Sequence, residues 1–452
     1  MNHRGQRRRI AFHAVTDALL GMALGLASTA VYAVPSFARQ TGMPCSACHT
    51  VFPELTAFGR SFKLNGYTLT GMKQIESTGT SGNVRINAIP PLSAMLQTGF
   101  THLNKAVPGQ QNDNVEFPQA LSFYFAGEIS PHMGSFLQVT YTQPDDHFGF
   151  DMADFRYANR TTLGERGLVY GVTLNNAPGM EDVWNTTPMW TYPYTASDTA
   201  PTPAAGPLVN MFMNVAGLGG YALWDNHWYG AATVYRSAPL GQGAAPSAGS
   251  VRNVAPYWRF AWQGYLPNRA YLEVGTYGLY ADFPRGMMGM GTPGLTDKYI
   301  DLAVDTSYQQ PLSGTHLLSL HGVYIHENRT LDSSFAKGLS SNRTDTMQQV
   351  RVDGNYEFSH HAQVSLGYFN TWGSTDAAFY ATTPGAVDNS SSGNPGSAGL
   401  ITEVDYLPWD NTKFSLQYTA YTKFNGAGSN YNGAGRSASD NNTLYLNSWL
   451  MW

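Results

Sequence analysis

The segment Lys413–Phe424, KFSLQYTAYTKF, decides the fold of this chain. Its residues form two alternating sets: Phe414, Leu416, Tyr418 and Ala420 in one, and Ser415, Gln417, Thr419 and Tyr421 in the other. This alternation has the period of a β-strand and puts an apolar set and a mostly polar set on opposite faces. A run of about ten such residues is long enough to cross a membrane as a tilted strand.

Three other segments repeat the alternation: Lys298–Tyr308, Gln348–Phe358 and Gln363–Trp372. A half-buried strand of a soluble protein has the same local pattern. The length and number of the repeats instead favour an all-β transmembrane barrel. On this reading Arg351, Asp353 and Glu357 line the lumen, where they pair with one another, hold a plug or guide ions. The pattern favours none of these three roles.

The connections between strands alternate between short and long. The short ones lie at Ser130–Gly134, Thr161–Arg166, Asp225–His227, Leu266–Arg269, Gln310–Gly314, Ser359–His361 and Leu407–Asn411. The long ones lie at Asn104–Phe117, Pro144–Gly149, Asn176–Val209, Ser237–Asn253, Phe283–Thr296, Asn328–Thr346, Gly373–Ser397 and Asn425–Asn441. Outer-membrane barrels have short periplasmic turns and longer external loops. Counting from Val84, with a first strand near Ile86–Thr101, predicts about sixteen antiparallel strands.

The composition agrees with a bacterial outer-membrane barrel that contacts lipid. Charged residues make up 13% of the chain, against roughly 25% in ordinary soluble domains. The chain has 27 Tyr, 10 Trp and 47 Gly. A secreted all-β enzyme or adhesin would share part of this composition. The net charge of -5 argues against a nucleic-acid partner.

The first 33 residues are predicted to be a signal peptide for export. Four arginines, Arg4, Arg7, Arg8 and Arg9, precede a mostly apolar run from Ala14 to Val31 that Asp17 interrupts. Val31-Tyr32-Ala33 has the small-x-small pattern of a cleavage site, which places the mature start at Val34. A retained amphipathic helix is the alternative.

Cys45-Ser46-Ala47-Cys48-His49 is a C-x-x-C-H pentapeptide and contains both cysteines of the chain. This spacing is the attachment signature of c-type haem, in which two thioethers hold one haem and the adjacent imidazole ligates the iron. A redox dithiol, half of a zinc site and chance are the other interpretations. A redox dithiol would be expected in a βαβ context, which the sequence does not offer.

Residues 34–80 therefore form a predicted monohaem cytochrome c segment, and residues 84–452 the barrel. Such a short segment buries too little surface to fold around a haem alone. We expect it to act as a plug in or at the mouth of the barrel. Pro53–Lys63 predicts a helix that Gly66 ends, with an apolar stripe that packs on the porphyrin, formed by Leu55, Phe58 and Phe62.

Residues 37–49, FARQTGMPCSACH, and 52–67, FPELTAFGRSFKLNGY, resemble the fused monohaem cytochrome–porins of bacterial outer membranes. The best known members of that family are iron oxidases. The resemblance implies electron transfer across the outer membrane, with one covalent haem c and His49 as the proximal iron ligand. It further implies an extracellular metal ion, Fe(II), as electron donor and a periplasmic acceptor such as a soluble cytochrome or a cupredoxin. On that basis the chain would be an Fe(II):cytochrome oxidoreductase.

Three alternatives to that function stay open: a solute porin with a structural or regulatory haem plug, a conduit for another extracellular donor, and a secreted haem protein with a soluble β-domain. The sixth iron ligand is also open. Met72 leads the candidates because it follows the predicted helix and could fold back over the iron, and a methionine ligand raises the haem potential. The other candidates are Met43, Met95 and His321.

Two further clusters are expected to be ordinary external loops. Met287-Met288-Gly289-Met290 offers soft donors that suit Cu(I), and Asp145-Asp146-His147 offers ligands that suit Fe(II).

Overall fold

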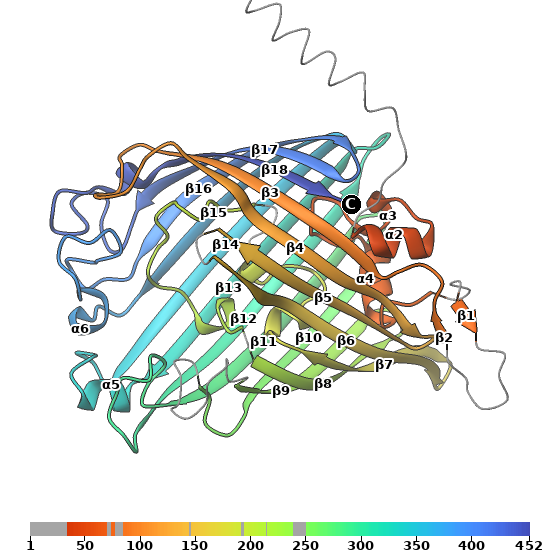
Figure 1. The fold of residues 1–452 in the computed structure, drawn as a ribbon. Coiled ribbons are helices and arrows are strands. Elements are labelled where there is room, and N and C mark those ends of the chain that lie inside the picture. The colour runs from red at the N-terminus through yellow and green to blue at the C-terminus, as the bar shows by residue number, and fades with distance from the viewer. Residues whose placement is uncertain are drawn as a thin grey trace, which may run out of the picture. The chain divides into compact units, whose positions relative to one another are not determined.

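Sixteen strands pair side by side into a closed antiparallel barrel in the computed structural model of the protein (Figure 1). The structure describes residues 34–69, 74–76, 85–143, 146–190, 194–213, 215–237 and 250–452. All of these lie in the compact unit Tyr32–Trp452. Among them, no helix is long and apolar enough to span a membrane.

The barrel strands are β3 Leu92–Leu103, β4 Asn114–Ser130, β5 Met133–Thr142, β6 His147–Leu163, β7 Arg166–Asn175, β8 Val215–Trp224, β9 Trp228–Ser237, β10 Ala255–Tyr265, β11 Tyr271–Pro284, β12 Thr296–Pro311, β13 Leu317–Thr330, β14 Thr344–Ser359, β15 Ala362–Gly373, β16 Ser397–Trp409, β17 Thr412–Lys423 and β18 Thr443–Met451. Two short strands, β1 Gln74–Glu76 and β2 Arg85–Asn87, pair only with each other. The helices are α2 Pro35–Thr41, α3 Cys45–Cys48, α4 Ala57–Leu64, α5 Asp332–Ala336 and α6 Ala377–Tyr380. The 3-10 helices are η1 Pro178–Glu181, η2 Pro188–Trp190, η3 Leu208–Asn210 and η4 Ala438–Asn441.

The last strand closes the barrel on the first. β18 pairs with β3 from Thr443 opposite Leu103 to Met451 opposite Met95. The sixteen strands confirm the predicted number, and because this number is even, both ends of the barrel lie on the side with the short turns. The predicted first strand was placed too early, because Arg85–Asn87 belongs to the separate β1–β2 pair and the barrel wall begins at Leu92.

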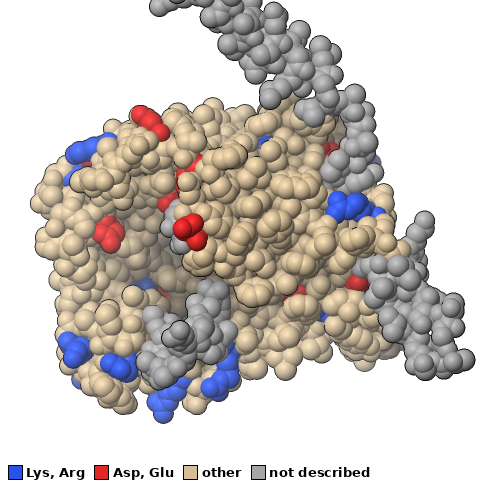
Figure 2. All heavy atoms as spheres, viewed as in Figure 1, with Lys and Arg blue, Asp and Glu red and all other residues tan. Residues whose placement is uncertain are grey.

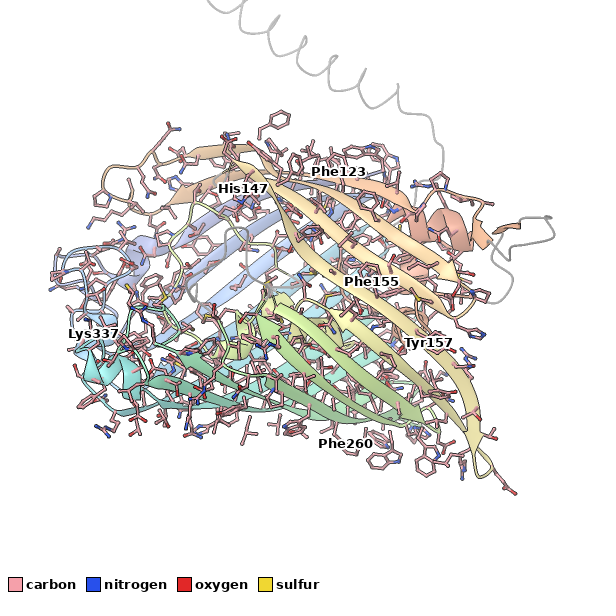
Figure 3. The ribbon with its side chains drawn as sticks, turned by 60° about the horizontal axis from the view of Figure 1, so that its bottom comes forward. Phe123, His147, Phe155, Tyr157, Phe260 and Lys337 are labelled. Carbon is pink, nitrogen blue, oxygen red and sulfur yellow. The ribbon has the colours of Figure 1, made fainter. Side chains whose placement is uncertain are left out.

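The two faces of each strand differ as the alternation predicts. In β17, Phe414, Leu416 and Tyr418 are 44%, 46% and 39% exposed on the outer surface, whereas Ser415 and Gln417 are buried in the lumen. Phe260 likewise points away from the wall (Figure 3). On the face that Figure 2 shows, Lys, Arg, Asp and Glu gather mainly toward the two ends of the barrel and leave a largely uncharged surface between them. A closed barrel with an apolar exterior satisfies every ladder hydrogen bond within lipid.

Helices α2, α3 and α4 form a plug at the end of the barrel that carries the short turns (Figure 1). Pro35 suits the first turn of α2, and Gly42, with φ +70°, ends it in the left-handed conformation. Helix α4 starts later than predicted. Thr56 caps it by accepting a hydrogen bond from Gly59 N at 3.1 Å, so Pro53 lies before the helix rather than in its first turn.

The connection between β7 and β8 is long, as predicted, but it is not an external loop. It folds into the lumen, where Gln119 donates to Ala196 O at 2.8 Å from β4, and Leu208 N donates to Glu327 of β13 at 2.6 Å. We call the described part of this connection, residues 176–190 and 194–213, the luminal loop. Its apolar residues Leu208, Val209 and Phe212 join a buried cluster on the inner faces of β9–β13.

Candidate haem site

Helix α3 presents both thiols to one cavity. Cys45 and Cys48 sit at its two ends, one helical turn apart, and both line the cavity; no disulfide joins them. Burial raises the pKa of the Cys48 thiol to about 11. A redox-active dithiol instead needs a cysteine whose pKa is depressed. The surroundings of Cys48 therefore do not favour the dithiol interpretation.

The ring of His49 is held through one nitrogen. Its Nδ1 lies 3.3 Å from the carbonyl oxygen of Pro53 and 3.2 Å from that of Glu54, so Nδ1 carries the proton and donates it. Burial lowers the pKa of His49 to about 4, against the opposing effect of these hydrogen bonds, so the ring is neutral at neutral pH. The lone pair then resides on Nε2. A histidine that ligates a metal is held in this way, with its other N–H given to a carbonyl.

A cavity of about 510 Å³ separates the plug from the wall formed by β3–β6 and β18. Its volume falls within the roughly 300–1,000 Å³ of cofactor pockets. Its apolar lining comes from both the plug and the wall, with Phe37, Phe52, Leu55, Phe62, Phe136 and Trp449. Two thiols, one neutral imidazole and a large apolar cavity fit a covalently attached haem.

Polar residues of the wall and of the luminal loop also line this cavity. They include Gln119 and Thr140 of the wall, Asp151 of β6 and Asp198 of the luminal loop. Asp151 accepts a hydrogen bond from Thr140 at 3.1 Å. The lining of the cavity therefore combines apolar side chains of the plug and the wall with carboxylates of β6 and the luminal loop.

A buried ion pair anchors the plug to the barrel wall. Oε1 of Glu54 lies 2.9 Å from Nε2 of His321 in β13, and Nδ1 of His321 lies 3.1 Å from Oδ2 of Asp353 in β14. Burial alone would raise the pKa of Glu54, but the pair with His321 lowers it below its usual value. Both ring nitrogens of His321 are engaged in this way, and His321 does not line the cavity. We therefore exclude His321 as an iron ligand.

Three other contacts fix the plug. Arg60 Nη2 donates to Gln309 of β12 at 3.1 Å, Tyr67 donates to Asp154 of β6 at 2.7 Å, and Tyr221 of β8 donates to the carbonyl of Leu64 at 2.9 Å. At Gly59, a Cβ atom would lie 2.2 Å from the carbonyl oxygen of Cys48, so only glycine lets α4 approach α3 this closely. None of these partners was evident from sequence, since each pairs residues far apart in the chain.

The luminal loop is held by buried charges. Arg156 of β6 contacts Asp154 at 2.7 Å and Glu181 of the loop at 3.6 Å. Arg259 of β10 lies 3.6 Å from Asp182 of the loop and also contacts Asp305. Sequence analysis missed Glu181 and Asp182 because they lie in a segment without strand periodicity.

The predicted lumen residues do face inward, and they pair. Arg351 Nε lies 3.4 Å from Asp353, and Glu357 lies 3.0 Å from His360. Asp353 reaches the plug through His321, so two of the three roles left open by the sequence, pairing and holding the plug, describe these residues.

The predicted porphyrin stripe is partly wrong. Leu55 and Phe62 line the cavity, but Phe58 is 37% exposed and does not line it. Helix α4 starts at Ala57, and its buried side includes Phe62 and Leu64 rather than Phe58. Met43 and Met95 also line the cavity, whereas Met72 lies outside the described residues.

The two external clusters add no site. Met288 and Met290 are 59% and 56% exposed, while Met287 packs against the buried cluster. Asp145 lies outside the described residues, and Asp146 accepts a hydrogen bond from Tyr141 at 2.9 Å. Within the described ranges, no group of three or more His, Cys, Asp or Glu could hold a metal ion.

Closure, turn asymmetry and the apolar exterior identify the architecture. The chain is an outer-membrane β-barrel of sixteen antiparallel strands. No protein-family model matches it, and no curated protein matches it.

The chain is similar to several solved structures whose titles name outer-membrane proteins or a porin. A loop-deletion mutant of OmpT from Vibrio cholerae is 9% identical, with a TM-score of 0.45 over 80% of this chain and 98% of that chain. The outer-membrane channel DcaP of Acinetobacter baumannii is 11% identical, with a TM-score of 0.45 over 80% of this chain and 96% of that one. The anion-selective porin from Comamonas acidovorans is 11% identical, with a TM-score of 0.45 over 80% and 98%.

Proposed function

We propose that this protein transfers electrons across the outer membrane by means of one covalent haem c in the plug. One observation carries the proposal: the thiols of Cys45 and Cys48 and the neutral ring of His49 line one large, mostly apolar cavity. When bound, the haem would supply a one-electron couple of its iron. Cys45 and Cys48 would hold it through thioethers, and His49 would be its proximal ligand.

The plug contributes position and insulation. The contacts of Glu54, Arg60 and Tyr67 with the wall hold α3 at the end of the barrel with the short turns, which is the periplasmic end. Arg39 and Pro44 are exposed on the plug at this end. A periplasmic carrier such as a soluble cytochrome or a cupredoxin could therefore dock close to the thiols.

The electron donor in this proposal is a metal cation, Fe(II), outside the cell. The net reaction moves one electron from Fe(II), which becomes Fe(III), to an oxidised periplasmic carrier. Asp151 and Asp198 support a cationic donor, because carboxylates in the lining of the cavity attract cations and repel anions. With this donor the protein is an Fe(II):cytochrome oxidoreductase.

Solute passage is the second candidate function. The porin-type barrel favours it directly, since a sixteen-stranded wall encloses an aqueous lumen and a channel needs no cofactor. The plug would then be structural or regulatory. The luminal loop and the plug both narrow the lumen. Electron transfer is therefore expected with low conductance, whereas solute passage requires a lumen that conducts.

Liposomes that enclose an oxidised soluble cytochrome test the two functions together. With the full-length protein inserted and Fe(II) outside, we expect the enclosed cytochrome to be reduced, together with low conductance. A denaturing gel stained for haem peroxidase activity should show covalent haem at full length, and the Cys45→Ser/Cys48→Ser variant should lose both signals. If the wild-type protein does not stain for haem but passes small solutes, the electron-transfer proposal is wrong and the porin function is supported.

The protein could also stain for haem, stay oxidised in the presence of Fe(II) and accept electrons from another external donor. This result would contradict Fe(II) as the donor and leave the proposed electron transfer in place.

A further inference from the structure

We infer that Met95, on the barrel wall, supplies the sixth ligand to the haem iron, so that the iron links the wall to the plug. This inference rests on the proposed function, because it requires a haem at Cys45, Cys48 and His49. It assigns a role to a strand residue that belongs to the barrel and not to the cytochrome segment.

Met95 is placed where such a ligand is needed. It lies on β3, is 3% exposed, and lines the same cavity as Cys48 and His49. It belongs to a buried apolar cluster against which Val34 and Phe37 of the plug pack. A ligand from the wall therefore faces the cavity from an element other than the one that carries His49.

The sulfur of Met95 is oriented by hydrogen bonds. The hydroxyl of Tyr124 on β4 donates to Sδ at 3.2 Å, and Nε2 of Gln97 lies 3.7 Å from the same atom. Tyr124 is 4% exposed and packs its ring against Phe136 at 5.8 Å between centroids, so the donor is itself held. A thioether sulfur has two lone pairs: Tyr124 engages one of them at 3.2 Å, and the iron would take the other in place of the longer contact with Gln97 at 3.7 Å. A fixed thioether loses less conformational entropy on ligation than a mobile methionine side chain.

Other methionines line the cavity but lack this arrangement. They are Met43, Met152, Met180 and Met451. Among the described residues, Met95 is the cavity-lining methionine whose sulfur accepts hydrogen bonds. Met43 is also too close in sequence to Cys45 to reach the face of a haem opposite His49. His321 is excluded by its two carboxylate partners.

Ligation by Met95 would raise the reduction potential of the haem relative to a bis-histidine haem. The hydrogen bond from Tyr124 withdraws electron density from the sulfur and would raise the potential further. A haem with a high reduction potential can oxidise a donor whose own reduction potential is high. This agrees with the Fe(II) donor proposed above.

The test compares Met95→Leu with Met451→Leu in the full-length, haem-loaded protein. Met451 is the direct cross-strand partner of Met95 and is equally buried, at 4% against 3% exposed, so it is a matched control. The Leu substitution conserves volume and keeps the cluster packed. We expect Met95→Leu to abolish the sulfur-to-iron charge-transfer band of the ferric haem, to let the ferrous haem bind carbon monoxide, and to lower the potential. Met451→Leu makes the same change in the cavity lining without removing the proposed ligand, so it should keep the charge-transfer band and leave the ferrous haem closed to carbon monoxide.

Tyr124→Phe provides a second measurement in a variant that keeps Met95. It should retain the charge-transfer band but lower the potential. Persistence of the band in Met95→Leu, its absence from the wild-type protein, or its loss only in Met451→Leu would each overturn the assignment of Met95. Absence of covalent haem from the wild-type protein would instead overturn the proposed function, so the two failures are distinguishable.

Discussion

Oε1 of Glu54 lies 2.9 Å from Nε2 of His321, and both residues are buried. Glu54 also accepts a hydrogen bond from Nδ1 of His49 through its backbone carbonyl. One residue of the plug therefore holds the imidazole with its main chain and the barrel wall with its side chain. The orientation of His49 depends on a contact made by β13.

Replacing Glu54 by Ala should release the plug. Removal of one partner from a buried pair leaves the other charge unpaired and costs about 3–5 kcal/mol. In the full chain without haem, we expect Cys48 to react with a thiol reagent at a lower denaturant concentration than in the wild type. The double variant Glu54→Ala/His321→Ala should lose less than the sum of the two single variants.

Asp225→Ala is the control for that experiment. Asp225 pairs with Arg166 at 2.7 Å on a short turn, but the Arg166 side chain is 63% exposed. An exposed pair contributes about 0–1 kcal/mol. Equal effects of Glu54→Ala and Asp225→Ala would show that the plug does not depend on the Glu54–His321 pair.

Replacing Gly59 by Ala should force α4 away from α3. The new Cβ would lie 2.2 Å from the carbonyl oxygen of Cys48, and overpacking of this kind costs roughly 1–3 kcal/mol. We expect a lower midpoint of thermal unfolding and a smaller fraction of chains with covalent haem. Ser61→Ala, at an exposed position of the same helix, should leave both values near those of the wild type. Haem attachment that is equally complete in both variants would contradict the requirement for glycine.

Replacing Leu416 by Arg should impair assembly of the barrel by about 2–4 kcal/mol if the residue lies near the middle of the lipid layer. Its neighbour Gln417 faces the lumen and donates to Glu403 at 2.7 Å, so Gln417→Arg keeps a long polar side chain beside a carboxylate. The share of unboiled protein that migrates as folded barrel in a detergent gel measures the difference. Equal shares for the two variants would refute the assignment of the two faces.

Lys63 should make stability depend on pH. Burial lowers its pKa from 10.5 to about 8, with Arg156 as a further cause. Between these values the unfolded chain binds more protons than the folded one, so this group makes the free energy of unfolding rise with pH. Below about pH 8, Lys63 is charged in both the folded and the unfolded protein, so burial of its charge lowers the free energy of unfolding in full. Lys63→Met should therefore be more stable than the wild type at neutral pH.

The stability gap between Lys63→Met and the wild type should narrow as pH rises from about 8 to about 10.5. Denaturant unfolding of both proteins in detergent over this range measures it, and the difference between the two curves removes the titration of the buried tyrosines that they share. A gap that stays constant would mean that Lys63 keeps its charge throughout.

Local patterns accounted for most of the barrel. The alternation in Lys413–Phe424 gave the inward and outward faces of β17, and the alternation of short and long connections gave the strand number. The start of α4 was misplaced because Thr56 provides a side-chain cap, which outweighs the preference of Pro53 for a first turn. The path of the luminal loop could not be read, since an irregular segment has no periodicity to show which surface it contacts.

The sequence by itself determined the barrel and the attachment signature, because side-chain alternation and the spacing of Cys45, Cys48 and His49 are properties of neighbouring residues. Only the tertiary structure decided which distant residues meet the plug. Closure of β18 on β3 and the inward fold of the luminal loop bring Met95 and Asp198 to the same cavity. The folded barrel also places His321 against Glu54 of the plug. Contacts of this kind depend on the register of the whole barrel, which no local stretch of residues encodes.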